Sequence, residues 1–340
     1  MTTSSVVQET VATTVDHQGS GPGSTEPGKT ATPAKGDKPA RRRKTNFGMF
    51  LWVSPFLVLA FLFSYFPLYG WIYSLYDYKP ALGLSGSEFV GFQWFRLLVS
   101  SPAQVEQIGK VLTNTFAISF LGIATSVLPL IFAVFLNEVR VKWFRNMVQT
   151  LTTLPNFISW VLVYMIAFSL FSSTGLVNDV LMDAGLITTP MKFLDSDQHV
   201  WLTMTAWSIW KGLGWGAIIY LAAIAGVDPS LYESAKMDGA GRFQTMWYVT
   251  IPQLMPTYLV LLLLSVANLL NNGMEQYFVF QNAFNKEHIQ VLDLYVYNIG
   301  LTGNSMSMAT AIGMLKSLIS VVLLFTVNAI AKRVRGQSLV

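Results

Sequence analysis

Few side chains in this sequence could perform covalent chemistry. The chain has no cysteine, which excludes disulfides, thiolate metal sites and a cysteine nucleophile. Its three histidines, His17, His199 and His288, lie in the N-terminal stretch and in loops, without a histidine–carboxylate cluster or metal-ligand spacing. We therefore predict that the chain is not an enzyme, has no metal site and carries no cofactor of its own.

Polar side chains inside long apolar runs indicate hydrogen bonding to a solute instead. Asn268, Asn271 and Asn272 stand three or four positions apart, so one helix would place them on the same face. A polar side chain in lipid is costly, so this face is predicted to point inward, where the amides can bind sugar hydroxyl groups. The alternative for each asparagine is a hydrogen bond to a neighbouring helix.

Lys211 interrupts another apolar run. A lysine at the bilayer centre costs about 2.5–3.5 kcal/mol on insertion scales unless it reaches water or a partner. Two alternatives follow: Lys211 pairs with a carboxylate such as Glu275, or it lines the translocation cavity and meets the substrate. Trp207, Trp210 and Trp215 flank it, and aromatic faces beside a cation suit a sugar, with or without a carboxylate.

These residues require a scaffold that spans a membrane, and the composition supplies one. The chain is 52% hydrophobic, 12% charged and has a mean hydropathy of +0.47, which is too apolar for an ordinary soluble domain. Long apolar runs exceed the roughly 20 residues needed to cross the hydrocarbon core, and strands alone cannot satisfy their backbone there. We predict an all-α membrane protein with one membrane domain, 45–335, and six transmembrane helices at about 49–76, 112–137, 147–171, 201–224, 251–274 and 307–330.

Basic residues predict the orientation. Most lysines and arginines lie on one side, in the N-terminal stretch and at 140–145, 236–242 and 332–335. The other side holds Lys79, Arg96, Lys110, Lys192 and Lys286. Because short cytoplasmic loops carry the excess of lysine and arginine, we predict that both termini and the fourth-to-fifth connection, 225–250, are cytoplasmic.

The two ends of the chain are predicted to be tails. Residues 1–44 are rich in Ser, Thr, Gly and Pro and cannot bury a core, so we expect a disordered cytoplasmic tail, with a short second tail at 336–340. The sequence "GSTEPGKT" at 23–30 matches a phosphate-binding pattern, but Gly and Pro residues around it do not support the required strand and helix. No nucleotide site is predicted there.

The connection at 225–250 is short and contains several charged residues and glycines. Asp228 and Pro229 are typical of a helix start, Ser230 and Glu233 have capping-box spacing, and Gly239 is typical of a helix end. A second helical piece leads to Pro252, where the fifth span is predicted to begin. The apolar residues of this elbow need a partner surface to cover them.

The same segment resembles the E-A-A-x3-G-x9-I-x-L-P loop of permease subunits in binding-protein-dependent ABC importers. Glu233-Ser234-Ala235 is followed after three residues by Gly239 and after nine more by Val249-Thr250-Ile251-Pro252, with conservative changes at 234, 249 and 251. In that family the loop is a coupling helix that docks into a groove of the cytoplasmic ATPase. The resemblance implies these ATPase-coupling residues: Leu231, Tyr232, Glu233, Ala235, Asp238, Gly239, Ala240, Phe243 and Pro252.

Two longer stretches, 114–161 and 210–241, resemble the carbohydrate-importing branch of this family. They are similar to the LplB-type oligosaccharide permeases and, more distantly, to the larger maltose permease subunit, and the resemblance covers about residues 46–335. It implies the type I ABC importer permease fold in a bacterial cytoplasmic membrane. It also implies a heterodimer with a second permease, two ATPase subunits that hold ATP and Mg, and an extracytoplasmic sugar-binding protein, with no nucleic-acid partner.

The resemblance also extends to substrate contacts. Asn271, Asn272, Ser208 and Gly212 match sugar contacts of the maltose-type permease by their distance from the loop motif, and Asn156 matches more weakly. The predicted substrate-binding residues are Asn156, Ser208, Trp210, Lys211, Gly212, Asn268, Asn271, Asn272 and Glu275.

Two alternatives to sugar import stay open. One is an ABC importer permease for another solute, such as a polyol phosphate or a peptide. The other is a secondary transporter, for which inverted repeats and acidic or histidine proton relays in the spans are expected, and no acid lies deep within a span.

Overall fold

The computed structural model describes residues 47–335, and the chain divides into two units, residues 1–57 and 58–340. The described part of the first unit lies in α1 (Phe47–Ala60), an apolar helix with Pro55 inside it. The predicted tails at 1–44 and 336–340, and the pattern at 23–30, lie outside the described residues.

The first half of the second unit is helical apart from one short antiparallel strand pair, in which Tyr76 faces Phe89 and Asp77 faces Glu88. A π-turn (Phe61–Tyr65) and a 3-10 helix (Phe66–Leu75) continue from α1 toward these strands. The following elements are β1 (Tyr76–Asp77), β2 (Glu88–Phe89), α2 (Gln93–Ser100), α3 (Pro102–Thr125), α4 (Leu128–Asn137), α5 (Lys142–Thr153), α6 (Trp160–Phe171) and α7 (Leu176–Asp183).

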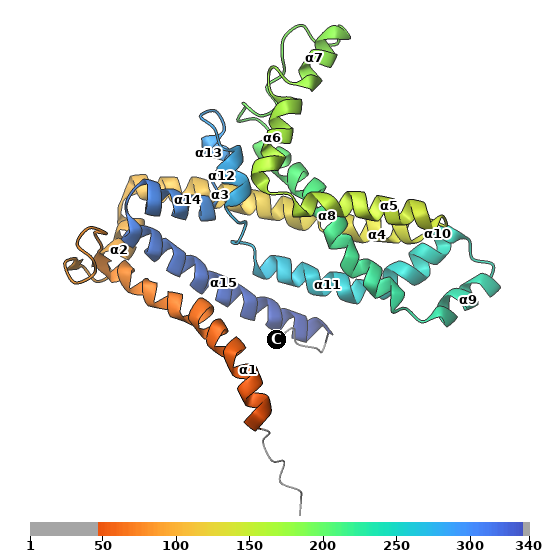
Figure 1. Cartoon of the computed structure of the whole chain (residues 1–340), viewed down its shortest axis with the longest axis horizontal. Coiled ribbons are helices and arrows are strands. Elements are labelled where there is room, and N and C mark those ends of the chain that lie inside the picture. Colours follow the sequence, from red (N-terminus) through yellow and green to blue (C-terminus); the bar gives the residue numbers. More distant parts are fainter. Residues whose placement is uncertain (1–46, 336–340) are drawn as a thin grey trace, which may run out of the picture. The chain divides into compact units, whose positions relative to one another are not determined.

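The second half continues without a further strand among the described residues. Its elements are α8 (Val200–Ala225), α9 (Pro229–Met237), α10 (Arg242–Thr245), α11 (Ile251–Ala267), α12 (Glu275–Phe280), α13 (Lys286–Ile289), α14 (Leu292–Tyr297) and α15 (Met306–Arg335). Within the second unit, α9 and α10 lie at one end and α2 with the strand pair at the other, with α3, α8, α11 and α15 running between them (Figure 1).

Six helical stretches within residues 47–335 are long and apolar enough to cross a membrane, which confirms the predicted architecture of a six-span helical membrane protein. They are Phe50–Leu75, Pro102–Asn137, Trp160–Asp183, Val200–Ala225, Arg242–Ala267 and Met306–Arg333.

The third span differs from the single helix expected over 147–171. The polar helix α5 stops at Thr153, a 3-10 turn occupies Leu154–Phe157, and α6 begins only at Trp160. Figure 1 shows α6 pointing away from the direction of α5. Pro155 has no backbone N–H to extend the hydrogen bonds of α5, and the chain leaves the helical conformation at Ile158 and Ser159, where the Ser159 hydroxyl caps α6 by accepting from the Leu162 amide.

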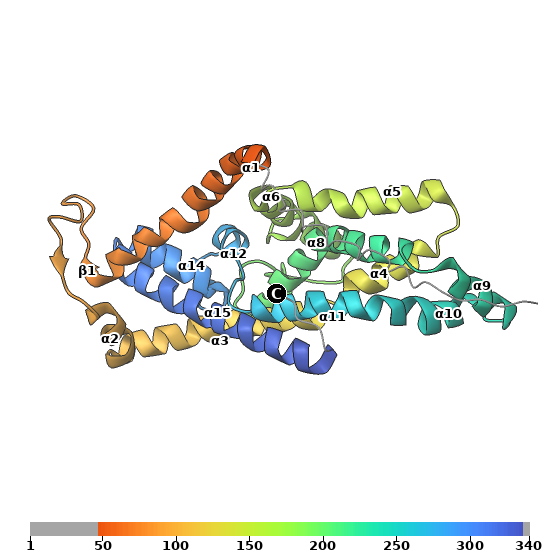
Figure 2. The ribbon, with the colours of Figure 1, turned by 90° about the horizontal axis from the view of Figure 1, so that it is seen from below.

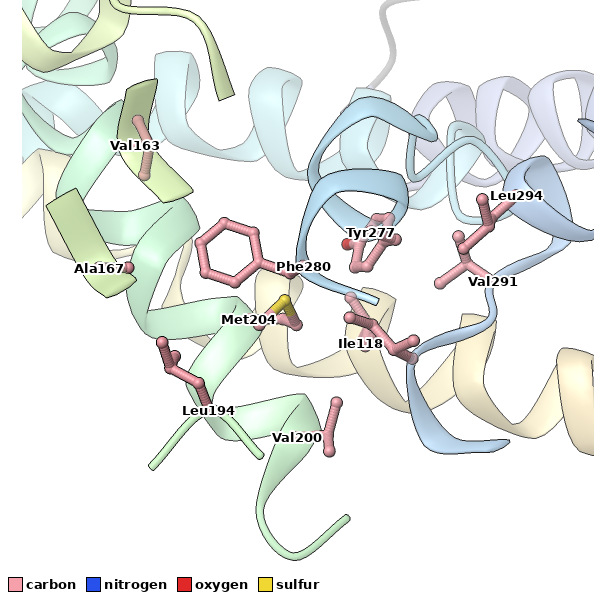
Figure 3. Packing of buried hydrophobic residues seen from close by; sticks show 11 residues of the cluster. Ile118, Val163, Ala167, Leu194, Val200, Met204, Tyr277, Phe280, Val291 and Leu294 are labelled. Carbon is pink, nitrogen blue, oxygen red and sulfur yellow. The ribbon is translucent and has the colours of Figure 1, made fainter. Parts of the chain in front are cut away.

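Buried side chains join the spans in separate clusters. In one, Leu130, Ala133 and Val134 of α4 pack with Ala217 and Tyr220 of α8, and both views show these helices close to α5 (Figure 2). In another, α12 stands at the centre: its Tyr277 and Phe280 pack against residues of α3, α6, α8 and α14 (Figure 3). α12 is therefore a short helix whose buried aromatic side chains hold the surrounding spans together.

Candidate functional site

The connection between α8 and α11 forms the predicted helix and turn. The Asp228 carboxylate caps α9 by accepting a hydrogen bond from the Ser230 amide at 2.9 Å, and Pro229 occupies the first turn. The hydrogen bonds from the Ser230 backbone and side chain hold the pKa of the Asp228 carboxyl below its ordinary value. The helix start is thus fixed by Asp228 itself.

The end of α9 also follows the prediction. Gly239 has a φ of +75°, a left-handed conformation that a residue with a Cβ adopts at a cost. Its amide donates to the Lys236 carbonyl at 3.1 Å, and the Ala240 amide donates to Ala235 at 2.9 Å, which satisfies carbonyls at the helix end. After this turn, α10 and a π-turn (Met246–Thr250) lead directly into α11, with Pro252 in its first turn.

The predicted coupling residues, together with the neighbouring Met237, lie on two sides of this elbow. Met237 and Phe243 are 87% and 77% exposed, and Leu231 is also exposed. Glu233 is exposed too, so one surface combines a carboxylate with large apolar side chains. Tyr232 instead turns back toward the membrane helices: it is half-buried, and its hydroxyl lies 3.4 Å from the Thr250 hydroxyl.

A salt bridge that sequence reasoning missed ties the elbow to α4. Arg242 Nε lies 3.1 Å from Glu138 Oε2, and an Arg242 Nη2 hydrogen bond reaches the Glu138 carbonyl. These two residues also line an open pocket of about 450 Å³ together with Phe135, Phe243 and Met246. The elbow is therefore bonded to the end of α4 as well as continuous with α11.

Four of the predicted substrate contacts meet in one pocket. Ser208, Asn268, Asn271 and Asn272 line an open space of about 340 Å³, which we call the polar pocket. Ser119, Thr205, Ser265 and Tyr277 also line it, and sequence reasoning did not single them out. Each is a hydroxyl residue in an apolar surrounding, which is the signal that could have found them.

The asparagines do not share a helix face as expected. α11 ends at Ala267, and the chain then turns through an irregular segment in which Gly273 has a φ of +74°. Asn268 is the C-terminal cap of α11, and Asn271 Nδ2 donates to Asn268 Oδ1 at 3.3 Å. The pocket is thus formed by a helix end, which leaves polar backbone and side-chain groups where a continuous helix would bury them.

One hydrogen-bond chain runs along the pocket wall. Asn272 Nδ2 donates to the Ser119 hydroxyl at 2.8 Å, and that hydroxyl donates to the Leu269 carbonyl at 2.6 Å. Asn272 Oδ1 is buried and has no hydrogen-bond partner within residues 47–335. A buried acceptor with no partner is unfavourable by about 1–3 kcal/mol, so a small rotation of the Asn272 amide toward a donor would be favourable.

The irregular segment is held by a second ion pair that sequence reasoning missed. Asp293 of α14 accepts a hydrogen bond from the Gly273 amide at 2.9 Å and forms a salt bridge with Lys316 of α15. The apolar run of the sixth span contained an unexplained lysine, which was the available signal. Its partner lies 23 residues away in the chain, on a separate helix.

The other predicted substrate contacts lie outside the polar pocket. Lys211 Nζ donates to the carbonyls of Asn156 at 2.7 Å and Pro155 at 3.3 Å, and lies 5.4 Å from the centroid of the Trp160 ring. No salt bridge joins it to Glu275 within the described residues. Lys211 thus bonds the Asn156 carbonyl at the interruption of the third span and adds a second donor to the Pro155 carbonyl, which already accepts from the Ile158 amide, a role that neither sequence alternative contained.

Three further predicted substrate contacts, Trp210, Gly212 and Glu275, also lie outside the polar pocket. Trp210 packs edge-on against Trp207 at 5.6 Å, Gly212 has no neighbouring atom where a Cβ would stand, and Glu275 begins α12. Ser208, in contrast, both lines the polar pocket and donates to Gln276 Oε1 at 2.7 Å. Ser208 therefore belongs to the polar pocket, whereas Trp210, Gly212 and Glu275 do not line it.

Lys211→Met should destabilise the third span. The variant leaves two carbonyls without a charged donor, and we expect a loss of about 1–2 kcal/mol in the free energy of unfolding. The measurement is the melting temperature of the detergent-solubilised protein, with Lys332→Met, at an exposed position of α15, as the control. If Lys211→Met melts like the wild type but loses solute uptake, Lys211 belongs to the substrate path and not to the scaffold.

Comparison with known protein families identifies the family of this chain. Residues 125–336 match the family described as binding-protein-dependent transport system inner membrane component. The chain belongs to this family. The permease is thus a membrane component of its importer and not the ATPase, and the secondary-transporter alternative is removed.

Relatives and solved structures agree with this assignment. The permease is 37% identical over 298 residues to protein LplB of Bacillus subtilis (strain 168), across 87% of this chain and 92% of that protein. It is 37% identical over 287 residues to the polygalacturonan/rhamnogalacturonan transport system permease protein YteP of the same organism, across 84% and 88%. The crystal structure of a bacterial ABC transporter involved in the import of the acidic polysaccharide alginate matches with a TM-score of 0.75 and 31% identity, over 85% of this chain and 96% of that one. The predicted type I importer permease fold is confirmed.

Proposed function

We propose that this permease carries oligosaccharides across the bacterial cytoplasmic membrane, after an extracytoplasmic solute-binding protein delivers them. The observation that carries the proposal is the polar pocket, where Ser119, Ser208 and the three asparagines present hydroxyl and amide groups between apolar spans. Sugars need many such groups at once, because each hydroxyl that loses water must find a new hydrogen bond. The named relatives that transport polygalacturonan, rhamnogalacturonan and alginate support the same substrate class.

The pocket chemistry favours a sugar over the phosphate-bearing alternative. A relative from Pectobacterium atrosepticum is named as an sn-glycerol-3-phosphate transport system permease, at 27% identity. The residues that line the polar pocket include no lysine, arginine or histidine to pair with a phosphate. At about 340 Å³ the pocket is at the small end of ligand sites, so it holds one end of a chain, and the second permease completes the site.

The assembly proposed for transport has one copy of this chain, a second permease and two ATPase subunits that hold ATP and Mg. The exposed surface with Glu233, Met237 and Phe243 docks on an ATPase, where a groove covers the apolar side chains. The excess of lysine and arginine on that side supports a cytoplasmic elbow and two cytoplasmic termini.

Coupling then follows from the continuity of α11. Its 17 residues span about 25 Å at 1.5 Å per residue, from the elbow to the cap at Asn268. When ATP binding draws the ATPases together, a shift of α9 and α10 moves α11 as a rod and displaces the asparagines at its far end. Access to the polar pocket thereby alternates between the two sides of the membrane.

Asn272→Leu should abolish sugar uptake. The substitution removes the amide that bonds Ser119 and puts an apolar side chain in the pocket wall, so the wall offers fewer polar groups to a sugar. We expect at least a tenfold loss in uptake of the transported oligosaccharide by the complex in proteoliposomes, with basal ATPase activity retained. Thr326→Val, an exposed hydroxyl residue on α15 outside the pocket, is the control and should transport normally. Wild-type uptake by Asn272→Leu would remove the polar pocket from the sugar path.

A further inference from the structure

A second polar cavity lies far from the elbow. It measures about 800 Å³, and we call it the outer cavity. Its walls come from the beginning of α3 and from the chain between α12 and α15. α3 and α4 together run 36 residues, about 54 Å at 1.5 Å per residue, before reaching Glu138, which bonds the elbow. The outer cavity is therefore at the opposite membrane surface from the elbow.

The lining of the outer cavity is rich in side-chain amides. The residues that carry the argument are Gln107, Gln281, Gln290, Asn298, Lys110 and Lys286. Gln107 and Gln290 share one long hydrogen bond of 3.3 Å, which leaves further donor and acceptor capacity on both amides. Gln281 also lines the cavity, and its Oε1 is buried with no hydrogen-bond partner among the described residues, so this amide is not committed to a partner within them.

An aromatic side chain completes this lining. Phe278 is 43% exposed and lines the cavity, and Tyr297 packs edge-on against it at 5.4 Å. This contact fixes the ring and leaves the rest of its surface for a ligand. An apolar ring surface beside several amides matches a pyranose, which has an apolar face and hydroxyl groups at its rim.

The charges at the outer cavity are nearly balanced. Lys110 forms an ion pair with Glu106 at 3.2 Å, and Lys286 is adjacent to Glu287, which lines the same space. The local field therefore does not demand a charged ligand. The amides and the aromatic ring, and not a net charge, determine what fits.

One short helix separates the outer cavity from the polar pocket. Tyr277 of α12 lines the polar pocket, while Phe278 and Gln281 line the outer cavity. We infer that the outer cavity is a second oligosaccharide subsite, which holds one part of the sugar chain while another part enters the polar pocket beyond α12. This inference rests on the proposed function. It predicts that the outer cavity contributes to transport of long chains and not of short ones.

The test compares chain lengths in the reconstituted complex with its binding protein. The probes are alginate disaccharide and pentasaccharide, and neutral arabino-oligosaccharides of the same lengths. For the class that the wild type transports, Gln281→Leu and Phe278→Ala should raise the pentasaccharide concentration at half-maximal uptake at least tenfold and leave disaccharide uptake within twofold. Gln198→Leu, at an exposed glutamine that does not line the cavity, is the matched control.

Each outcome decides between the two claims. Wild-type dependence on pentasaccharide concentration in both variants overturns the outer subsite and leaves the proposed function intact. An equal loss of disaccharide and pentasaccharide uptake also overturns it, because the cavity would then serve the structure and not chain length. If the wild-type complex transports neither class with the binding protein present, the proposed function fails, and the outer subsite fails with it.

Discussion

Gly214→Ala should disrupt the packing of α8 against α5. A Cβ at this position would stand 2.3 Å from the Thr152 carbonyl carbon and 2.5 Å from the Thr153 backbone nitrogen, so two helix backbones must separate. Overpacking of side chains costs about 1–3 kcal/mol, and backbone atoms yield less readily. We expect either loss of folded protein from the membrane or a melting temperature at least about 5 °C lower in detergent.

Gly212→Ala is the matched control for this prediction. It lies on the same helix, and no atom stands within 4 Å of its Cβ position. In a helix interior, alanine is favoured over glycine by roughly 0.5–1 kcal/mol, so this variant should melt at or above the wild-type temperature. If both alanine variants melt together with the wild type, the close approach of α8 and α5 is wrong.

Gly239→Pro should abolish transport while the protein still inserts into the membrane. Proline holds φ near −65°, whereas Gly239 has a φ of +75°, and proline also removes the amide that bonds Lys236. The turn between α9 and α10 must then change direction, and the exposed coupling surface no longer fits one groove. We expect at least a hundredfold loss of ATP-driven uptake and loss of ATPase subunits on co-purification.

Two further variants separate coupling from folding. Glu233→Ala removes an exposed carboxylate, so it should lower transport without a change in melting temperature. Gly185→Pro places proline at another left-handed glycine, with a φ of +69°, in the loop after α7, and should retain the ATPase subunits. Normal uptake by Gly239→Pro with the ATPase attached would contradict the coupling role.

The six spans could be predicted from sequence because lipid imposes one requirement on all of them, a run of about 20 apolar residues. The interruption of the third span could not, because residues 146–178 carry no charge and read as one long run. Hydropathy does not register that the chain leaves the helical conformation at Ile158 and Ser159, or that Lys211 on a different helix bonds the Asn156 and Pro155 carbonyls. Such a pairing depends on which helices become neighbours.

The candidate site was predictable only where its structure depends on residues close together in the sequence. The elbow is local, so Asp228, Pro229 and Gly239 indicate its start and end by their own conformational preferences. The polar pocket is not local: Asn272 meets Ser119 from another span, and Asp293 with Lys316 holds the segment that carries it. The three asparagines line one pocket but do not share a helix face as predicted, because α11 ends at Ala267, before all three.

The central claim is that this permease moves oligosaccharide through the membrane at the expense of ATP. The most direct test is accumulation of labelled oligosaccharide in proteoliposomes that contain the permease, its partner permease and the ATPase, with the sugar-loaded binding protein on the face opposite the elbow. We predict accumulation that requires both the binding protein and ATP on the elbow side, and that ceases in Asn272→Leu and Gly239→Pro. Accumulation without ATP, or none in the complete system for the uronic and neutral oligosaccharides, would contradict the claim.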